Sequence, residues 1–492
     1  MTSAEEPKLG TDPREPASLG AIPEIPSSSA LRRSGGQTLS ELLKSLMALR
    51  KSAPALLAFR ASMWSVAGYG VSTVLRFVSR LALAKFLHDS SPMGDVAIIV
   101  VILAGLEMIS DLGIGFNIVQ HKRGDDGAFL GTAFSVQAIR GVGIWALASL
   151  LAAPVAWIYH DKDLIGLLLF GALGTLVRAF ANPGVWVLTR RVELKGPTLL
   201  TVASEIAGFA VTIVWSILAP SAWAIVGGTL ATSVVYAVGS HFLGIKVRFA
   251  WDGKVARQIA QFGGWMILSS STYFLSSRGE ALMLRGSIPD AQFGCFAFAS
   301  MLVTTPVSAI TQLASQVFFP TLASSIREDP QRALRLYTRS KWMFTAVALC
   351  FAGGGMLLGP PIVHLLGLQG KFVGLEWMVQ LLGLRAALEI YGSPTGTVLF
   401  ASGASRYSAA GNAVRLVFLV VGLFLTLKLW GLPGAFIALI GAPFLAYFAL
   451  MPGINKHMPG ALRVEAASLV ALVVGSALAT AAAWYISPLA LN

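Results

Sequence analysis

Three charged side chains, Arg278, Glu280 and Arg285, interrupt an otherwise apolar stretch of the sequence. The stretch, residues 261–320, contains two apolar runs joined near Pro289. Each run has about 20 residues or more, which is long enough to cross a bilayer. Moving a charge from water into hydrocarbon is costly, so an ionisable residue inside such a run indicates a functional site. The first hypothesis is therefore a polar site within a membrane.

Charges recur in the other apolar runs, and arginine predominates among them. Away from the ends of the apolar runs lie seven basic and five acidic residues: Arg76, Arg80, Glu107, Asp111, Arg140, Arg178, Glu205, Arg278, Glu280, Arg385, Glu389 and Arg415. The guanidinium group of arginine binds phosphate through two parallel hydrogen bonds and keeps its charge. This composition favours a cavity that receives an anionic group.

The candidate residues divide by charge into two roles. The candidates for contact with a substrate in the cavity are four arginines: Arg76, Arg80, Arg278 and Arg140. The candidates for binding a coupling ion or accepting a proton are three acidic residues: Glu280, Glu107 and Asp111. Arg76 and Arg80 share one helix face, because they are one helical turn apart.

Pairing between the charges is the alternative to a binding site. Arg76, for example, could pair with Glu107 and hold one conformation of a helix bundle. Arg385 and Glu389 have the i,i+4 spacing of an internal salt bridge. Both roles stay open for the arginines at this point.

The elements that position these residues are predicted to be membrane-spanning helices. Thirteen apolar runs qualify: residues 61–86, 93–119, 128–157, 164–187, 198–218, 222–243, 259–284, 291–319, 342–367, 375–400, 408–428, 431–451 and 464–487. A further amphipathic helix is predicted before residue 342, with Asp329 as its cap and Pro330 in its first turn.

An internal repeat indicates that the spans form two lobes. Trp64 precedes Gly94 by 30 residues, and Trp265 precedes Gly294 by 29 residues. In both copies a long charged helix is followed by a turn and a second helix. Weak internal repetition of this kind is typical of secondary transporters.

The repeat and the loops predict five segments of the chain. They are a disordered or amphipathic cytoplasmic N-terminus (1–60), a six-helix lobe (61–243), a cytoplasmic linker (244–258), a second six-helix lobe (259–452) and an extra helix with the C-terminus (453–492). Within the first segment, residues 39–50 have the apolar spacing of a helix on a membrane surface, and a disordered segment is the alternative.

Composition and charge support a polytopic membrane protein. Hydrophobic residues make up 55% of the 492 residues, charged residues 12%, and the mean hydropathy is +0.70. The net charge of +13 is concentrated in short loops, where 17 lysines and arginines lie on one side of the predicted membrane and 5 on the other. Basic loops face the cytoplasm, so the N-terminus is predicted inside and the C-terminus outside. Nucleic-acid binding is not indicated.

The sequence lacks the motifs of several classes of enzyme. The phosphate-binding pattern G-x-x-x-x-G-K-[ST] is missing, so no built-in ATPase is expected. HExxH, CxxC and G-x-S-x-G are missing as well, which disfavours a metalloprotease or serine hydrolase. An integral-membrane enzyme acting on lipid-linked sugars would place acid–base residues in a long external loop, whereas these loops are short. We expect that the protein is not an enzyme and binds no metal or cofactor. A proton or sodium gradient is the expected energy source for transport.

Several short motifs resemble those of a known family. They are Ala61-Ser62-Met63-Trp64-Ser65, Ser110-Asp111-Leu112-Gly113-Ile114-Gly115, Ile118-Val119-Gln120, Pro289 with Phe293-Gly294, Thr305-Pro306-Val307-Ser308, Phe318-Phe319-Pro320 and Glu328-Asp329-Pro330. With these the chain resembles the polysaccharide transporters, Wzx-like oligosaccharide flippases of the multidrug/oligosaccharidyl-lipid/polysaccharide exporter superfamily. The resemblance covers about residues 60 to 452. It departs at Ser91-Pro92-Met93-Gly94, where the family usually has an acidic residue and Phe before the glycine.

The resemblance implies a fold and a function. The fold is an all-α polytopic membrane protein with two six-helix bundles in a V-shaped MATE-like arrangement, to which this chain adds a thirteenth helix. The function is to move undecaprenyl-diphosphate-linked oligosaccharide repeat units from the cytoplasmic to the periplasmic leaflet by alternating access, for exopolysaccharide, capsule or O-antigen synthesis. The location is the bacterial inner membrane, and a polymerase and export machinery are implied partners.

Two other transporters and one enzyme remain as alternatives. A flippase for peptidoglycan lipid precursors would need the same arginines for its diphosphate cargo. A MATE-type exporter of cationic drugs would favour an acidic cavity, which the excess of basic residues opposes. An integral-membrane polysaccharide polymerase is the enzyme alternative.

Overall fold

Membrane-spanning segments must satisfy their backbone hydrogen bonds internally, and long apolar runs do so as helices. The computed structural model describes residues 53–121, 123–368, 370–402, 404–458 and 460–486. The helices in these ranges are α2 (Ala53–Phe86), α3 (Ser91–Ile109), α4 (Ile114–Gln120), α5 (Gly127–Tyr159), α6 (Asp163–Ala179), α7 (Gly184–Arg190), α8 (Lys195–Leu218), α9 (Ala222–Ser240), α10 (Gly253–Arg285), α11 (Asp290–Glu328), α12 (Pro330–Leu365), α13 (Leu375–Ala401), α14 (Ser405–His457) and α15 (Ala461–Ile486). The described residues contain no strand, so the prediction of an all-α fold is confirmed.

The chain divides into two units, residues 1–59 and residues 60–492. In the first unit the described residues form the start of α2. The segment 39–50 that was predicted as an amphipathic helix lies outside the described residues. Residues 60–492 form the second unit. The boundaries of the two lobes within it stay a prediction.

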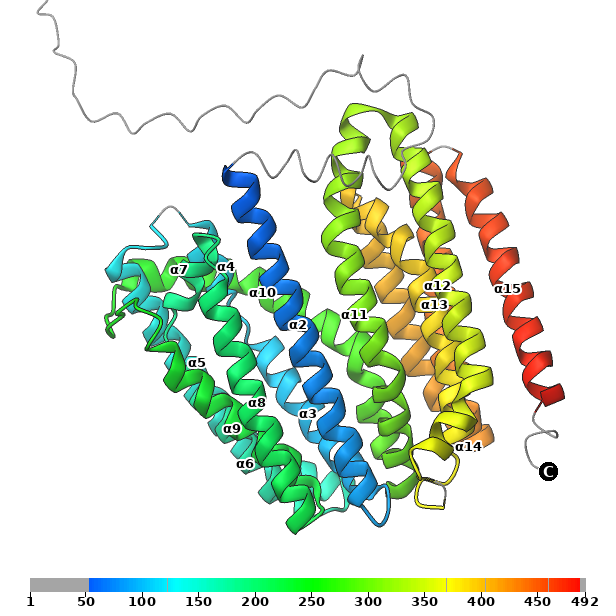
Figure 1. Ribbon diagram of the computed structural model, residues 1–492, viewed down its shortest axis with the longest axis horizontal. Coiled ribbons are helices and arrows are strands. Elements are labelled where there is room, and N and C mark those ends of the chain that lie inside the picture. The colour runs from blue at the N-terminus through cyan, green and yellow to red at the C-terminus, as the bar shows by residue number, and fades with distance from the viewer. Residues whose placement is uncertain (1–52, 122, 369, 403, 459, 487–492) are drawn as a thin grey trace, which may run out of the picture. The chain divides into compact units, whose positions relative to one another are not determined.

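The helices of residues 60–492 pack as two groups. In the first group α8 packs on α9 and α5 packs on α6, and in the second α13 packs on α11, α12 and α14. Figure 1 shows α5, α6, α8 and α9 on one side and α11–α15 on the other, with α2, α3 and α10 between them. Helix α3 packs against both α10 and α11, so it joins the two groups.

Eight of the described helices are long and apolar enough to span a membrane. The bent pair α6 and α7 would make a ninth span, with an angle of 60° at the break. Helices α2, α10 and α13 are not among them, and these helices carry many of the predicted site charges. The chain is therefore a multi-pass membrane protein, and its total of thirteen spans stays a prediction.

The structure breaks two of the predicted spans and places a third break where two predicted spans meet. The predicted span 93–119 is divided into α3 and α4 before Gly113, which has a φ of +60°. The predicted span 164–187 is divided into α6 and α7. Helix α14 carries both of the predicted spans 408–428 and 431–451 and departs from helical geometry at Gly431, where φ is +62°. A positive φ suits glycine because it has no Cβ.

The predicted start of the helix before residue 342 is confirmed. The Asp329 carboxylate accepts hydrogen bonds from the backbone N–H groups of Gln331 and Arg332, and Pro330 occupies the first turn. The helix does not end before the next span, however. It continues as α12 to Leu365, so the amphipathic segment and the span form one rigid element.

Candidate functional site

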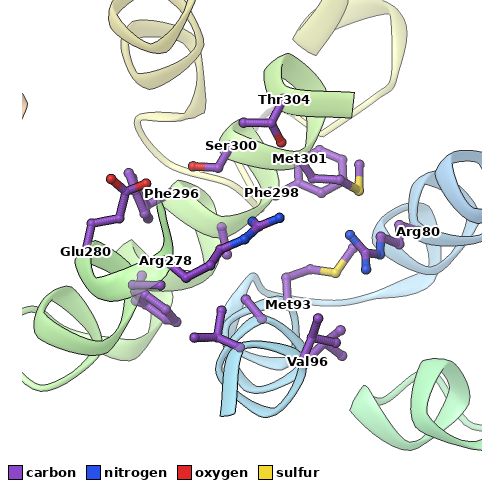
Figure 2. Close-up of a pocket in the computed structure, with 16 residues that line it drawn as sticks. Arg80, Met93, Val96, Arg278, Glu280, Phe296, Phe298, Ser300, Met301 and Thr304 are labelled. Atoms are coloured by element: carbon purple, nitrogen blue, oxygen red, sulfur yellow. The ribbon is translucent and has the colours of Figure 1, made fainter. Parts of the chain in front are cut away.

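A pocket lies between helices of the two groups, and we call it the interlobe pocket. Its lining comes from α2, α3, α10 and α11: Arg80, Met93, Val96, Ala97, Val100, Val101, Arg278, Glu280, Ala281, Phe293, Phe296, Ala297, Phe298, Ser300, Met301 and Thr304. Most of these side chains are apolar, and the polar ones are few (Figure 2). The repeat thus places its two equivalent helix pairs around one cavity.

Two arginines enter the interlobe pocket from different helices. Figure 2 shows Arg278 extending from α10 toward Arg80 on α2. Among the described residues, neither guanidinium group has an ion-pair or hydrogen-bond partner. Two cations that share a cavity repel one another when neither is paired with a carboxylate, and a bound anion would relieve this repulsion. The structure brings these two predicted residues together.

Glu280 lines the same pocket but belongs to a chain of charges that extends behind it. Its Oε1 lies 2.7 Å from Arg385 Nη1, Arg385 Nε lies 3.3 Å from Glu389, and Arg415 Nη2 lies 2.6 Å from Glu389. The predicted pair of Arg385 and Glu389 is confirmed. The chain crosses α10, α13 and α14 and has no net charge. Ion coupling by Glu280 stays a prediction.

The structure places Arg140 and two of the predicted acidic residues in a different pocket. Arg140, Glu107 and Asp111 line a cavity inside the first group, together with residues of α5–α7 and α9. Arg140 donates hydrogen bonds to the Glu107 backbone carbonyl and to Ser110 Oγ. The Glu107 carboxylate accepts one from Thr175 Oγ1 at 2.9 Å.

Asp111 has a local structural role at the break between α3 and α4. Its Oδ1 accepts a hydrogen bond from Gly113 N at 2.9 Å, which holds the turn that redirects the chain. Short polar side chains commonly stabilise turns in this way. Arg140, Glu107 and Asp111 are therefore separate from the interlobe pocket, although the sequence grouped them with it.

Arg76 lies one turn before Arg80 but is not among the residues that line the interlobe pocket. Its Nε is 3.7 Å from Glu205 Oε1 on α8. The sequence suggested Glu107 as its partner, and that suggestion is wrong because Glu107 lies in the other pocket. Since more than half of the Arg76 side chain is exposed, this ion pair is weak.

A buried ion cluster lies at the end of the interlobe pocket where α2 ends and α3 begins, and the Arg285 guanidinium group is 5.8 Å from the ring of the lining residue Phe293. Arg285, at the end of α10, pairs with Asp95 on α3 at 3.0 Å, with Asp161 in the α5–α6 loop at 2.8 Å and with Asp290 on α11. The Arg285 side chain is fully buried. Asp161 thus belongs to a buried ion cluster although it lies in a short loop. We call these four residues the Arg285 cluster.

The corresponding glycines of the two repeats meet beside this cluster. An added Cβ on Gly294 would overlap the carbonyl oxygen of Ser90, and one on Gly94 would lie 2.9 Å from the Phe293 ring. The Ser90 hydroxyl also donates a hydrogen bond to the Ala291 carbonyl at 2.6 Å. The sequence predicted Gly294 in a turn, whereas it lies in the first turns of α11. The absent side chains allow α3 and α11 to touch and to close this end.

We expect Arg285→Ala to open the closed end. The change would leave three carboxylates together without their shared cation, and removing one partner of a buried ion pair is strongly destabilising. Cys295 can report the opening, because its thiol is buried beside Ser90 Oγ at 3.4 Å. In the purified Cys350→Ser protein, Arg285→Ala should raise the rate at which a maleimide labels Cys295 by about tenfold or more, the equivalent of at least about 1.4 kcal/mol.

Lys162→Ala is the matched control for this experiment. Lys162 is exposed in the same loop as Asp161 and is not part of the Arg285 cluster, so labelling of Cys295 should be unchanged. Equal labelling rates in Arg285→Ala and the parent protein would contradict a closing role for the cluster.

A second buried ion pair joins α15 to the rest of its group. Lys341 Nζ on α12 lies 2.7 Å from Glu465 Oε2 on α15, and both side chains are almost fully buried. Tyr337, Tyr447 and Thr395 donate hydrogen bonds to the Glu465 carboxylate. Lys341 was counted among the 17 lysines and arginines of the predicted cytoplasmic loops, but it lies within α12 and is buried. The sequence does place a carboxylate, Glu465, in the predicted span 464–487. A carboxylate in a span needs a partner, and this could have indicated the pair.

Comparison with known sequences identifies a protein family and two similar membrane or polysaccharide-biosynthesis proteins. A sequence model of the family described as "Polysaccharide biosynthesis protein" matches residues 82–369. An uncharacterized membrane protein in the cps region of Klebsiella pneumoniae is 21% identical over 403 residues, which are 80% of this chain and 82% of that protein. The lipopolysaccharide biosynthesis protein WzxC of Escherichia coli K12 is 22% identical over 352 residues, 69% of this chain and 68% of WzxC.

Comparison with solved structures identifies the fold. The lipid II flippase MurJ in an inward closed conformation matches with a TM-score of 0.65 and 13% identity, covering 87% of this chain and 99% of MurJ. A MATE family multidrug resistance transporter in an inward-facing conformation matches with a TM-score of 0.54 and 17% identity, covering 82% of this chain and 95% of the transporter. The predicted MATE-like transporter fold is therefore confirmed.

Proposed function

Because the chain belongs to the family of polysaccharide biosynthesis proteins, we propose that it is a flippase for undecaprenyl-diphosphate-linked oligosaccharides. The family and the fold are those of membrane transporters, so the chain is a transporter and not an enzyme. The proposed cargo moves from the cytoplasmic to the periplasmic leaflet of the bacterial inner membrane. There it would serve exopolysaccharide, capsule or O-antigen synthesis, together with a polymerase and export machinery.

The single observation that carries this proposal is the pair of unpartnered arginines in the interlobe pocket. A diphosphate loses its hydration when it leaves water, and only compensating charges make that loss tolerable. Arg80 and Arg278 supply two cations from α2 and α10, so an anion between them would contact both helices at once. A cationic drug would instead be repelled from this pocket, which disfavours a drug exporter.

Alternating access gives the proposed mechanism. The Arg285 cluster and the Gly94–Gly294 contact close the pocket at the end that the loop charges predict to be external. Cargo would enter from the cytoplasmic leaflet, the lipid chain would stay in the bilayer, and the diphosphate would bind Arg80 and Arg278. Opening toward the outside requires the Arg285 cluster to separate. Its three carboxylates would then face water, which lowers the electrostatic cost of the open state.

A gradient of protons or sodium ions is the proposed energy source. Glu280, Glu107 and Asp111 were the candidates for ion coupling, and the structure gives each of them a protein partner. The proposed coupling would therefore compete with one of these contacts. A transport assay with opposite proton and sodium gradients separates the two ions.

Deleting the gene tests the proposed function. We expect complete undecaprenyl-diphosphate oligosaccharides to accumulate in the inner leaflet while surface polysaccharide is lost, as measured by mass spectrometry of extracted lipids and by leaflet-specific labelling. Accumulation in the outer leaflet would instead indicate a missing polymerase. Accumulation of peptidoglycan precursors with normal surface polysaccharide would identify the rival cargo and contradict the proposal.

A further inference from the structure

One end of the interlobe pocket holds two buried oxygen atoms without a partner. They are Glu280 Oε2 and Ser300 Oγ, and neither has a hydrogen-bond partner among the described residues. The Glu280 residue is 9% exposed, and it lines the pocket together with Ser300. A buried polar atom without a partner is costly, so these atoms indicate a ligand that would complete their hydrogen bonds.

The positions of the oxygens relative to the arginines define a second subsite. Glu280 and Ser300 both line the pocket, and Figure 2 shows Arg278 extending away from Glu280 toward Arg80. The other oxygen of Glu280 is held by Arg385 at 2.7 Å. The Glu280 carboxylate is therefore fixed in place with its second oxygen free to accept a hydrogen bond.

The charges around this subsite favour a neutral donor over a cation. Arg385 neutralises Glu280, and the chain through Glu389 and Arg415 has no net charge. Arg278 and Arg80 add two unpaired positive charges to the same pocket. A metal cation would meet this net positive charge with only two free oxygens, fewer than the six or more that hard cations prefer. A hydroxyl group has no charge to repel and can donate to Glu280 and accept from or donate to Ser300.

We propose that Glu280 Oε2 and Ser300 Oγ bind hydroxyl groups of the sugar that is attached directly to the diphosphate. This inference rests on the proposed function, in which the diphosphate lies at Arg80 and Arg278. The first sugar is the group bonded to that diphosphate, so it reaches the end of the pocket beside the arginines. Glu280 thus contributes to recognition of the glycosylated lipid and not to ion coupling.

The test compares lipids with and without a sugar. The purified full-length protein in nanodiscs is titrated with undecaprenyl diphosphate and with the same lipid carrying one glucose, galactose or N-acetylgalactosamine. We expect the parent protein to prefer at least one glycosylated lipid. Glu280→Gln should weaken binding of that lipid by about tenfold or more, because hydrogen bonds to charged groups are strong, and should change binding of the bare lipid by less than about twofold. Ser300→Ala should weaken binding of the glycosylated lipid by a smaller factor.

Glu389→Gln is the matched control. Glu389 contacts Arg385 on the side away from the pocket and does not line it, so the preference for the glycosylated lipid should persist. If Glu280→Gln weakens binding of the bare and the glycosylated lipid equally, the sugar subsite alone is overturned. The same holds if lipid binding by the parent protein depends on sodium and Glu280→Gln removes that dependence. Lack of preference for any of the three glycosylated lipids in the parent protein would overturn it as well. A parent protein that binds none of the lipids would overturn the proposed function and the subsite with it.

Discussion

Arg278→Ala is expected to lower the rate of lipid-linked oligosaccharide flipping in proteoliposomes by roughly tenfold to 150-fold, because a charge-assisted hydrogen bond contributes about 1.5–3 kcal/mol. Arg80→Ala should have an effect of similar size, since the two guanidinium groups face the same pocket. Arg278→Lys should retain part of the activity, because lysine keeps the charge but lacks the planar fork that binds phosphate.

Thermal stability separates this effect from misfolding. Neither arginine has an ion-pair or hydrogen-bond partner among the described residues, so alanine at either position should leave the unfolding temperature unchanged or raise it. Arg123→Ala is the control for loss of a positive charge, because Arg123 forms an exposed pair with Asp126 that contributes little. Full activity of both Arg80→Ala and Arg278→Ala would exclude the two arginines as the diphosphate site.

The helical architecture was predictable because the bilayer imposes it. A long apolar run in a bilayer satisfies its backbone hydrogen bonds by forming a helix. The sequence repeat that begins at Trp64 and Trp265 indicated two related lobes. Breaks within predicted spans were missed at Gly113 and between α6 and α7, because the sequence of an apolar run does not reveal the backbone angles at a break. Those angles depend on packing between helices that are distant in sequence.

The pocket arginines were predictable, but their neighbours were not. A lone arginine in an apolar run is conspicuous, so Arg80 and Arg278 could be found from the sequence. The partner of each remaining charge comes from another helix, and one sequence does not identify which helices touch. The sequence thus did not reveal that Glu280 pairs with Arg385.

Charges at the ends of apolar runs were misassigned for a related reason. Arg285 and Lys341 lie near predicted span ends, where lysine and arginine usually reach water. In the structure both are fully buried and paired. A loop position in the sequence thus did not imply exposure, because the neighbouring helices extend beyond the predicted span and cover these residues.

The Lys341–Glu465 pair should dominate the stability of the second group of helices. Lys341→Met leaves the Glu465 carboxylate buried without its cation, and removing one partner of a buried pair costs about 3–5 kcal/mol. We expect a corresponding fall in the free energy of unfolding, measured by denaturant titration of the purified protein in detergent. Glu465→Gln should also be destabilising, because the ammonium group of Lys341 would then lack its counter-charge.

The double variant Lys341→Met/Glu465→Gln distinguishes an ion pair from two independent contributions. If the residues act as a pair, the double variant should be less destabilised than the sum of the single changes, because residues in contact are coupled. Additive losses would contradict the pairing. Since α15 supplies Glu465 and lies outside the two predicted six-helix lobes, a strong coupling would mean that the extra helix is part of the folded transporter and not an appendage. Its loss would then weaken the lobe that carries Arg278.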